Sequence, residues 1–254
     1  MSERVLLKLG GSVLTEKGAE GVIAEDVIRR IAREISLRKH HPLIVVHGAG
    51  SCGHPEAHRF GIDKGVKREN MEGVYQTHRA VSRLNMAVVG ALRDAGVEAI
   101  GIHPLDACIA EEGRLASCIH THLCLMTDIG IMPVLHGDVV MDNYQGACIV
   151  SGDQLIRYLA PLIGADRVGL ATDVPGVIHE GRVVPEISPA TAEKFRIGRS
   201  SHTDVTGGMA GKIGELLALA GEGISSDIFH VDRIGDFLDK KPHGGTRIIG
   251  GSNG

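Results

Sequence analysis

The chain has 254 residues, 43% of them hydrophobic, and a formal net charge of −4 at pH 7. This length suits one large α/β domain or two closely packed lobes, whereas the acidic balance and the scarcity of aromatic residues (no Trp, three Tyr, four Phe) argue against binding of nucleic acid or of an anionic membrane. The five cysteines form no CxxC pair and no apolar run approaches the length of a membrane span, so we expect reduced thiols and a cytoplasmic location.

Apolar runs and helical periodicity alternate along the first hundred residues. Pro55 predicts the start of a helix, because proline suits the first turn, and Gly96 predicts the end of a long one. We expect strands at 4–9, 43–47 and 98–103, and helices at about 24–38 and 71–95.

The same alternation continues to the end of the chain. Ser151 or Asp153 is placed to cap a helix that reaches about residue 162, and residues 177–184 predict a hairpin that turns at Glu180-Gly181. Strands alternating with helices predict a largely parallel sheet covered on both faces. The further strands that we expect are at 133–136, 168–173, 227–231 and 244–249. We also expect a helix at 119–129 and another that follows the segment 206–212 and ends at about residue 221.

Two glycine-rich segments follow apolar strands, Lys8-Leu-Gly-Gly-Ser12 and His47-Gly-Ala-Gly-Ser-Cys-Gly-His54. Glycines at a strand end allow several backbone N–H groups to face one concavity, where a phosphate can approach them. Lys8 adds a cation that can reach phosphoryl oxygens. The alternative for either segment alone is a glycine that merely ends a strand. Together they predict two facing phosphate sites, a donor and an acceptor, as phosphoryl transfer requires. There is no GxxxxGK[ST] or complete GxGxxG motif.

Charged side chains suited to phosphoryl transfer follow other strands and glycines. The reaction needs mostly positioning and neutralisation of charge, and Asp153, Asp173 and Lys212 can supply the charges. The surroundings of Lys17 are typical of a surface loop, so its local sequence favours a solvated lysine. His54 lies in the second glycine-rich segment and can donate a hydrogen bond to an acceptor phosphate; the alternative is a solvated loop histidine.

A possible zinc site is the segment Cys118-Ile-His-Thr-His-Leu-Cys124. On a helix its two i,i+4 pairs face different directions, whereas a tetrahedral site needs four converging ligands. The apolar residues between them favour a core helix, and we expect no resident metal there.

Taken together, these segments resemble the amino acid kinase superfamily over nearly the whole chain. Five ordered motifs are far more specific than one. They are Lys8-Leu-Gly-Gly-Ser12, His47-Gly-Ala-Gly50, Ser151-Gly-Asp153, Thr172-Asp-Val174 with Gly176-Val177, and Thr206-Gly-Gly-Met209 with Gly211-Lys212.

Within that superfamily the chain looks most like the archaeal isopentenyl phosphate kinases, because of His54, the Ser-Gly-Asp-Gln-Leu run at 151–155 and the run at 203–209. The resemblance implies one domain over 1–254, an open αβα sandwich with a mainly parallel sheet. An acceptor-binding lobe (about 1–165) would precede a nucleotide-binding lobe (about 166–254). It also implies a homodimer that uses ATP and Mg²⁺ to phosphorylate isopentenyl phosphate, with dimethylallyl phosphate as a possible second acceptor.

The resemblance also assigns roles to residues. Lys17 would reach the transferred phosphoryl group, so the family argument outweighs its local sequence. Asp153 would orient the lysines. The isoprenoid tail would lie against the long helix around Val74, Tyr75 and His78, and Cys52 stands where the family more often has an aromatic residue. ATP would contact Lys8, Gly10, Gly11, Ser12, Gly50, Thr172, Asp173, Gly208 and Lys212, and the acceptor phosphate Ala49, Gly50, His54 and Gly152.

Two alternatives stay open at this point. A related kinase of another small phosphate or phosphonate, such as a fosfomycin-type enzyme, would also use His54 for its acceptor. A non-catalytic nucleotide-binding protein of this fold is the other alternative, although the complete set of Lys8, Lys17, Asp153 and Lys212 counts against it.

Overall fold

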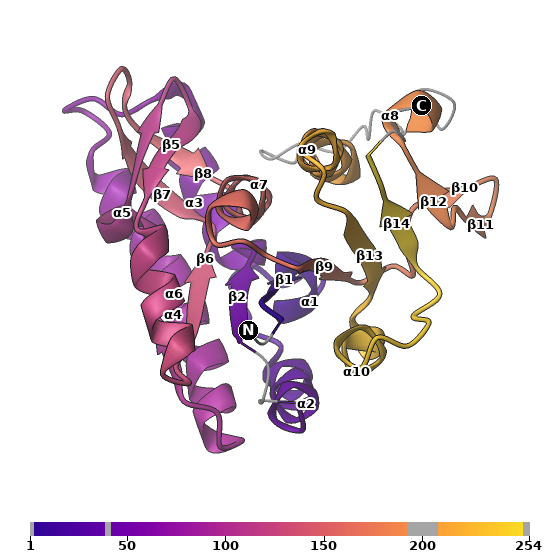
Figure 1. Cartoon of the computed structure of the whole chain (residues 1–254). Coiled ribbons are helices and arrows are strands. Elements are labelled where there is room, and N and C mark those ends of the chain that lie inside the picture. Colours follow the sequence, from indigo (N-terminus) through magenta and orange to yellow (C-terminus); the bar gives the residue numbers. More distant parts are fainter. Residues whose placement is uncertain (1–2, 39–41, 193–207, 251–254) are drawn as a thin grey trace.

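The computed structural model describes residues 3–38, 42–192 and 208–250 (Figure 1). Its centre is an eight-stranded sheet in the order β12-β14-β13-β9-β1-β2-β6-β3. Only the β13–β14 pair is antiparallel, which confirms the predicted mainly parallel sheet. The strands are β1 (Val5–Leu9), β2 (Leu43–His47), β3 (Ala99–Gly101), β6 (Met132–His136), β9 (Arg167–Thr172), β12 (Glu186–Ile187), β13 (Ser226–His230) and β14 (Thr246–Ile248).

Strand β1 lies at the middle of this sheet because its sequence is apolar on both faces. All five of its residues are buried, and it pairs in parallel with β2 and β9, with Leu7 opposite Val45 and Gly169. A near-continuous apolar run is typical of a parallel strand covered by helices on both sides. Lys8 is the one charged residue in this run, so its position in the centre of the sheet needs a compensating partner.

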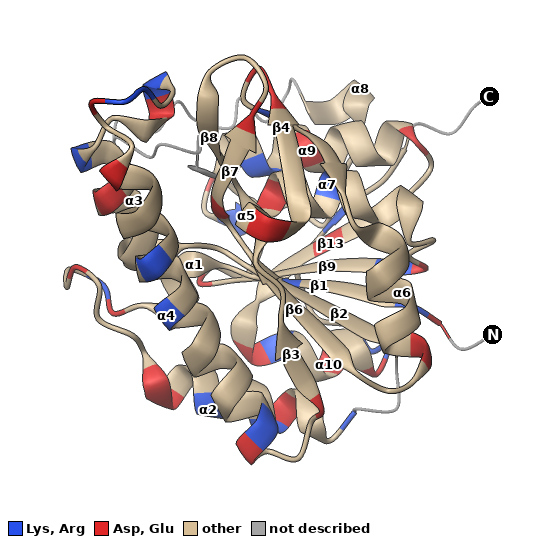
Figure 2. Ribbon diagram, turned by 90° about the vertical axis from the view of Figure 1, so that its left-hand side faces the viewer, with Lys and Arg blue, Asp and Glu red and all other residues tan. Residues whose placement is uncertain are grey.

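Helices cover both faces of the sheet (Figures 1 and 2). On one face α2 (Glu25–Ser36), α4 (Glu72–Asp94) and α10 (Ile234–Leu238) supply one buried apolar cluster. On the other face α6 (His120–Asp128), α7 (Gly152–Leu162) and α9 (Gly208–Gly221) supply the second. The fold is therefore the expected αβα sandwich.

A second sheet was not predicted. It contains β4 (Cys108–Glu111), β5 (Arg114–Cys118), β7 (Asp138–Asp142) and β8 (Gly146–Val150) in the order β5-β4-β7-β8. The sequence predicted no strand between residues 136 and 168, but β7 begins at Asp138. Strands of four or five residues contain too few alternations to be recognised by periodicity. This sheet matters because Asp138 begins one of its strands beside the central sheet.

Helix α3 (Gly50–Arg59) begins five residues before the predicted start at Pro55. Proline inside a helix has no N–H to donate, which leaves the carbonyl four residues earlier, that of Ser51, without its helical partner. The N–H of Gly21 donates to this carbonyl oxygen at 3.0 Å. The loop before α2 thus satisfies the interrupted turn, and α3 extends back to the second glycine-rich segment.

Other predicted boundaries are confirmed. Helix α4 ends before Gly96, whose φ of 80° suits glycine, and strands β10 (Ile178–His179) and β11 (Arg182–Val183) form the predicted hairpin. None of the helices in the described ranges is both long and apolar enough to cross a membrane. The remaining short elements are α1 (Gly11–Leu14), η1 (Ile62–Lys64), α5 (Pro104–Ala107), α8 (Pro189–Ala192) and η3 (Val231–Arg233).

Candidate active site

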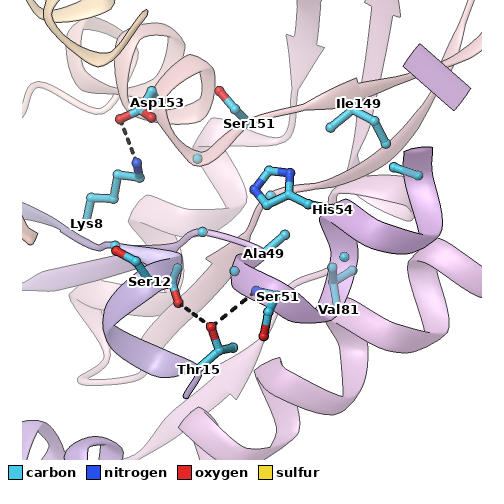
Figure 3. A pocket seen from close by; sticks show the side chains of 18 of the residues that line it. Lys8, Ser12, Thr15, Ala49, Ser51, His54, Val81, Ile149, Ser151 and Asp153 are labelled. Carbon is cyan, nitrogen blue, oxygen red and sulfur yellow. Dashed lines mark hydrogen bonds and ion pairs between the residues drawn. The ribbon is translucent and has the colours of Figure 1, made fainter. Parts of the chain in front are cut away.

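A cavity of about 520 Å³ opens where β1, β2, β6, β8 and β9 end (Figure 3). Ligands collect at this edge of an open α/β sheet because the strand ends, helix N-termini and loops converge there. Its lining includes every residue predicted to contact ATP or the reacting phosphates except Gly208. These are Lys8, Gly10, Gly11, Ser12, Lys17, Ala49, Gly50, His54, Gly152, Asp153, Thr172, Asp173 and Lys212.

The two glycine-rich segments touch each other along their backbones. A Cβ atom on Gly11 would lie 2.3 Å from the backbone N of Gly50, and one on Gly48 would lie 2.7 Å from that of Gly11. Gly50 also has a φ of 54°, a conformation that glycine adopts readily. The two backbones lie too close together for side chains at these positions. The glycines therefore do more than end a strand.

A hydroxyl that the sequence analysis did not identify joins these two segments. The side chain of Thr15 accepts a hydrogen bond from the backbone N–H of Ser51 at 3.2 Å and donates one to the carbonyl oxygen of Gly11 at 3.1 Å (Figure 3). Thr15 is buried, so it holds the N-terminus of α3 against the first glycine-rich segment. No local motif marks this residue, because its role depends on a contact with a residue 36 positions away.

Three charged side chains meet at the centre of the cavity. Lys8 Nζ lies 2.6 Å from Asp153 Oδ1, and Lys212 Nζ lies 3.4 Å from Asp153 Oδ2 (Figure 3 shows the first pair). Lys8 comes from β1, Asp153 from the first turn of α7 and Lys212 from α9. Gly152 makes room for this cluster, since a Cβ there would lie 3.0 Å from Lys8 Cε.

Burial and mutual charge set the protonation of this cluster. Burial would raise the pKa of Asp153, but the charges of Lys8 and Lys212 and their hydrogen bonds hold it below its ordinary value. Burial and, to a smaller extent, the charge of Lys212 lower the pKa of Lys8 to about 8, against the opposing charge and hydrogen bond of Asp153. Two cations around one carboxylate leave a net positive centre, as phosphate binding requires.

His54 projects from α3 into the cavity, between Ala49 and Ser151 in the view of Figure 3. Ala49 immediately precedes α3, and Ser151 caps α7 by accepting a hydrogen bond from the N–H of Gln154, as predicted. The N-termini of two helices thus face the cavity from neighbouring strand ends. Their orphan N–H groups and partial positive charges favour an anion in front of them.

A second, more exposed charged group lies at the rim of the cavity. Lys17 Nζ is 2.9 Å from Asp173 Oδ2, and Ser12 Oγ donates to Asp173 Oδ1 at 3.3 Å. Burial would raise the pKa of Asp173, whereas the hydrogen bond and charge of Lys17 lower it. The Lys17 side chain is 76% exposed. The structure thus brings Lys17 to the site despite the surface character of its sequence.

Two further predicted nucleotide contacts belong to the strands and helices of the C-terminal part. Thr172 ends β9, and its buried hydroxyl donates to the carbonyl oxygen of Val174 at 2.9 Å, which shapes the turn that carries Asp173. Gly208 is the first residue of α9, the helix that brings Met209 and Lys212 to the cavity. The preceding residues of the Thr206-Gly-Gly-Met209 motif lie outside the described ranges.

The residues of α4 that line the cavity are Thr77 and Val81, which the sequence analysis did not single out. Of the residues expected around the tail, Val74 packs against the apolar cluster that includes Ile149, and Tyr75 and His78 line a separate surface cavity. Their contact with a tail stays a prediction. Cys52 is buried in the core on the α4 side of the sheet and does not line the reaction cavity.

The expected helix over the Cys118–Cys124 segment begins only at His120. Cys118 belongs to β5 and lies directly opposite Cys108 of β4, with the two sulfur atoms 2.8 Å apart. Among the described residues, the segment does not bring its four possible ligands together. Its cysteines and histidines therefore form no tetrahedral site, for a reason that only the strand assignment reveals.

Comparisons with known proteins agree with this geometry. Residues 3–230 match the Amino acid kinase family. The chain is 41% identical to the isopentenyl phosphate kinase of Haloferax volcanii, over 92% of this chain and 94% of that protein, and 35% identical to that of Methanothermobacter thermautotrophicus, over 97% and 99%.

A solved structure described as an X-ray structure of isopentenyl phosphate kinase superposes with a TM-score of 0.85, at 33% identity, and covers 97% of this chain and 100% of that one. The similarity therefore spans the sheet, the cavity and the helices that line it. The chain belongs to the amino acid kinase family and, within it, to the isopentenyl phosphate kinases.

Proposed function

We propose that this chain transfers the γ-phosphoryl group of ATP to isopentenyl phosphate, giving isopentenyl diphosphate and ADP. The observation that carries the proposal is the Lys8–Asp153–Lys212 cluster, which lines the same cavity as the two touching glycine-rich segments and His54. An oxygen of the acceptor phosphate attacks the γ-phosphorus, and the bond from the γ-phosphorus to the β,γ-bridging oxygen breaks, with its electron pair leaving on ADP. Since the acceptor is already an oxyanion, no general base is needed.

On the nucleotide side, we assign the first glycine-rich segment and the C-terminal part of the cavity to ATP. Lys8 and Lys212 would neutralise phosphate charge, while Asp153 keeps the two ammonium groups at fixed positions. The division into an acceptor lobe (1–165) and a nucleotide lobe (166–254) belongs to this proposal. The residues assigned to ATP are Lys8, Gly10, Gly11, Ser12, Gly50, Thr172, Asp173, Gly208 and Lys212.

On the acceptor side, we assign the acceptor phosphate to Ala49, Gly50, His54 and Gly152. The support is that α3 and α7 direct their N-termini at this part of the cavity, where an anion is favoured. The tail would continue past the side chains of Val81 and Ile149, which line the adjoining wall (Figure 3).

Lys17 would act on the group in transfer. Its ammonium group is held at the rim by Asp173 and its side chain is largely exposed, so it is free to turn inward toward a bound triphosphate. A cation that contacts the migrating phosphoryl group in the transition state lowers the barrier by offsetting developing charge.

Mg²⁺, a homodimer and a cytoplasmic location are further parts of the proposal. The two carboxylates that line the phosphate end, Asp153 and Asp173, are each paired with a lysine. This arrangement suits a Mg²⁺ ion that arrives with ATP and keeps phosphate oxygens and water as its main ligands. When bound, the ion would offset negative charge on the phosphates.

The test is a coupled ADP-release assay with Mg-ATP and a panel of acceptors: isopentenyl phosphate, dimethylallyl phosphate, fosfomycin and acetylglutamate. Selective turnover of the isoprenoid phosphates is the expected result. Turnover of fosfomycin instead would favour the phosphonate-kinase alternative. ATP binding without turnover of any acceptor would favour the non-catalytic alternative.

The role of His54 can be tested separately with His54→Ala. Loss of one charge-assisted contact to the reacting phosphate is expected to lower kcat/KM for isopentenyl phosphate by roughly 10²–10³-fold, with little change in ATP affinity measured by calorimetry. His58→Ala is the matched control, because His58 lies on the same helix but is exposed. An equal loss of affinity for both substrates would contradict the assigned role.

A further inference from the structure

A group of four imidazoles, two buried and two half-buried, lies behind the acceptor end of the cavity and has no part in the proposed reaction. His47 ends β2, His136 ends β6 and His103 immediately precedes α5, and the rings of His47, His136, His103 and His78 follow one another at centroid distances of 5.5, 5.1 and 5.3 Å. Asp138 lies next to the last of them, with its Oδ2 2.9 Å from His78 Nδ1. Such a concentration of nitrogen and oxygen donors at one point is a candidate for metal binding.

The hydrogen bonds of this group fix where its ring protons lie. The ring of His136 is fully buried and lies between those of His47 and His103. Its Nδ1–H donates to the carbonyl oxygen of Gly137 at 3.1 Å, which leaves Nε2 to accept from His103 Nδ1–H at 2.9 Å. The lone pair of His103 is therefore on Nε2, and none of the described residues donates a hydrogen bond to it.

The outer ring is held in a similar way. His78 Nδ1 contacts Asp138, while His78 Nε2 lies 3.2 Å from the hydroxyl oxygen of Ser82. Because a hydroxyl can either donate or accept, Ser82 can satisfy Nε2 in either tautomer. His78 can thus exchange the proton on Nδ1 for another cation without losing its contact with Ser82.

Asp138 lacks a permanent positive partner. It is 1% exposed, and within the described ranges its ion-pair partners are the imidazoles of His78 and His136 alone, with no lysine or arginine. A buried carboxylate without a fixed cation is costly, and a divalent ion would supply the missing charge. Its second oxygen accepts from the N–H of Val139 at 2.8 Å, which fixes its orientation.

We propose that His78, His103 and Asp138 bind a divalent transition-metal ion of the zinc type. One donor atom from each of these residues lies within 4.8 Å of the other two, and they are the only such group of histidine, cysteine and acidic residues in the described part of the chain. Two imidazoles and one carboxylate suit Zn²⁺ and similar ions, whereas Mg²⁺ and Ca²⁺ prefer oxygen ligands. The bond from His103 to His136 is the kind of outer contact that orients a metal-binding imidazole.

The site has a route to solvent and a mechanical consequence. His78 and Ser82 line a surface cavity of about 710 Å³ beside α4, through which an ion can enter. A bound ion would join α4 to the first residue of β7 and to the segment before α5. It would therefore stiffen the wall behind the acceptor end of the reaction cavity, which Asp138 and Gly137 also line.

The test uses the full chain without an affinity tag, stripped of metal by chelation and titrated with Zn²⁺ alone, in the absence of ATP. Bound zinc is measured by equilibrium dialysis and elemental analysis, and Tm is followed in parallel. One ion per chain and a rise in Tm with zinc concentration are expected, because a ligand that binds only the folded state stabilises it. His103→Ala and His78→Gln should each weaken binding by about tenfold or more, and His136→Asn by about tenfold as an outer contact.

Two control variants distinguish this site from adventitious binding. His122→Ala removes an exposed histidine of α6, and Cys118→Ser removes a thiol of the Cys108–Cys118 pair. Both should bind zinc as the parent chain does. No bound zinc, binding that survives His103→Ala, or binding that either control abolishes would overturn the proposal. If His103→Ala does not fold, the visible absorption spectrum of Co²⁺ bound to the parent chain decides: nitrogen-rich four- or five-coordination supports the site, and a spectrum of hexaaqua Co²⁺ overturns it.

The outcome is independent of the kinase assignment. Asp138 lines the reaction cavity, whereas His78 and His103 do not. Zinc binding with the expected variant pattern would stand even if isopentenyl phosphate were not a substrate. Conversely, failure to bind zinc would leave the phosphoryl-transfer proposal intact.

Discussion

Two buried carboxylates at the same edge of the sheet are compensated in different ways. Asp153 lies between the ammonium groups of Lys8 and Lys212, whereas Asp138 contacts imidazoles and backbone N–H groups. Burial opposes the charge of both. The lysines nevertheless hold the pKa of Asp153 below its ordinary value, while burial raises the pKa of Asp138 despite its contact with His78.

The difference shows what each site is built to hold. A carboxylate between two permanent cations stays ionised and fixes their positions, so the centre is permanently positive and suits phosphate. A carboxylate next to titratable imidazoles has no fixed charge state, so the same place can hold a proton or a metal ion. The first arrangement suits binding of an anion and the second suits binding of a cation.

Asp153→Asn should produce the largest loss of stability, because it leaves two ammonium groups close together without a counter-charge. Removing one partner of a buried ion pair lowers the unfolding free energy by about 3–5 kcal/mol. We expect the lower end, about 3 kcal/mol, since Lys8 already has a pKa of about 8 and can lose its proton. Chemical denaturation monitored by circular dichroism measures the effect.

The control for this change is Asp26→Asn. Asp26 pairs with Arg29 on the surface of α2 and its side chain is 97% exposed, so the same chemical change should alter the unfolding free energy by no more than about 0.5 kcal/mol. Equal losses in the two variants would show that the Lys8–Asp153–Lys212 cluster is not held together by its charges.

The protonation of Lys8 predicts a decline in activity at alkaline pH. Its pKa falls from 10.5 to about 8 on folding, so the free enzyme loses this charge above about pH 8. We expect kcat/KM for ATP to fall by about tenfold per pH unit beyond that point. Lys8→Met should be slow at all pH values and lack this decline. An unchanged alkaline limb in Lys8→Met would assign the ionisation to another group.

The same shift has an opposite consequence for stability. Between about pH 8 and 10.5 the unfolded chain binds the proton that the folded chain has released, so the contribution of Lys8 to the unfolding free energy rises with pH across this interval. The cost of burying its charge is fully present below about pH 8. Rate and stability should therefore move in opposite directions over the same range, as far as Lys8 is concerned.

Much of the central sheet and the phosphate end could be predicted from the sequence, because the signals there are local. Val5–Leu9 is a strand that is apolar except for Lys8. The glycines that follow it allow a backbone contact between Gly11 and Gly50, and both of these residues lie in recognisable motifs. The resemblance to a known family then supplied the roles, including that of Lys17. The functional assignment is supported by relatives that span nearly the whole chain.

The second sheet and the imidazole group could not be predicted in this way. The strands that carry Cys118 and Asp138 are only five residues long, and Thr77 and Val81 differ from neighbouring residues of α4 only in which way they face. His78 and His103 are 25 positions apart and each is unremarkable in its own segment. Only the folded chain brings His78, His103 and Asp138 within 4.8 Å of one another.

Asp138→Asn should cost much less than Asp153→Asn. An amide oxygen in the position of Oδ1 can still accept from the N–H of Val139 and from His78 Nδ1–H, which lies 3.2 Å from that atom. The substitution also removes a buried charge that has no fixed partner. We expect a change of about 1 kcal/mol or less in the unfolding free energy in the absence of metal, measured by the same denaturation experiment. A loss as large as that for Asp153→Asn would show that Asp138 is held by a permanent charge after all.

Lys17→Met should change stability least of all, and this separates Lys17 from Lys8. Its ion pair with Asp173 is exposed, so the pair contributes at most about 0.5 kcal/mol to the unfolding free energy. If Lys17 turns inward to the transferred phosphoryl group, kcat should nevertheless fall by roughly 10²–10³-fold, with little change in KM for either substrate. Denaturation and steady-state kinetics on one preparation measure both. A kcat that stays within a few-fold of the parent would leave Lys17 a surface lysine, as its local sequence alone indicated, and the net positive centre around Asp153 would then have to supply the transition-state charge by itself.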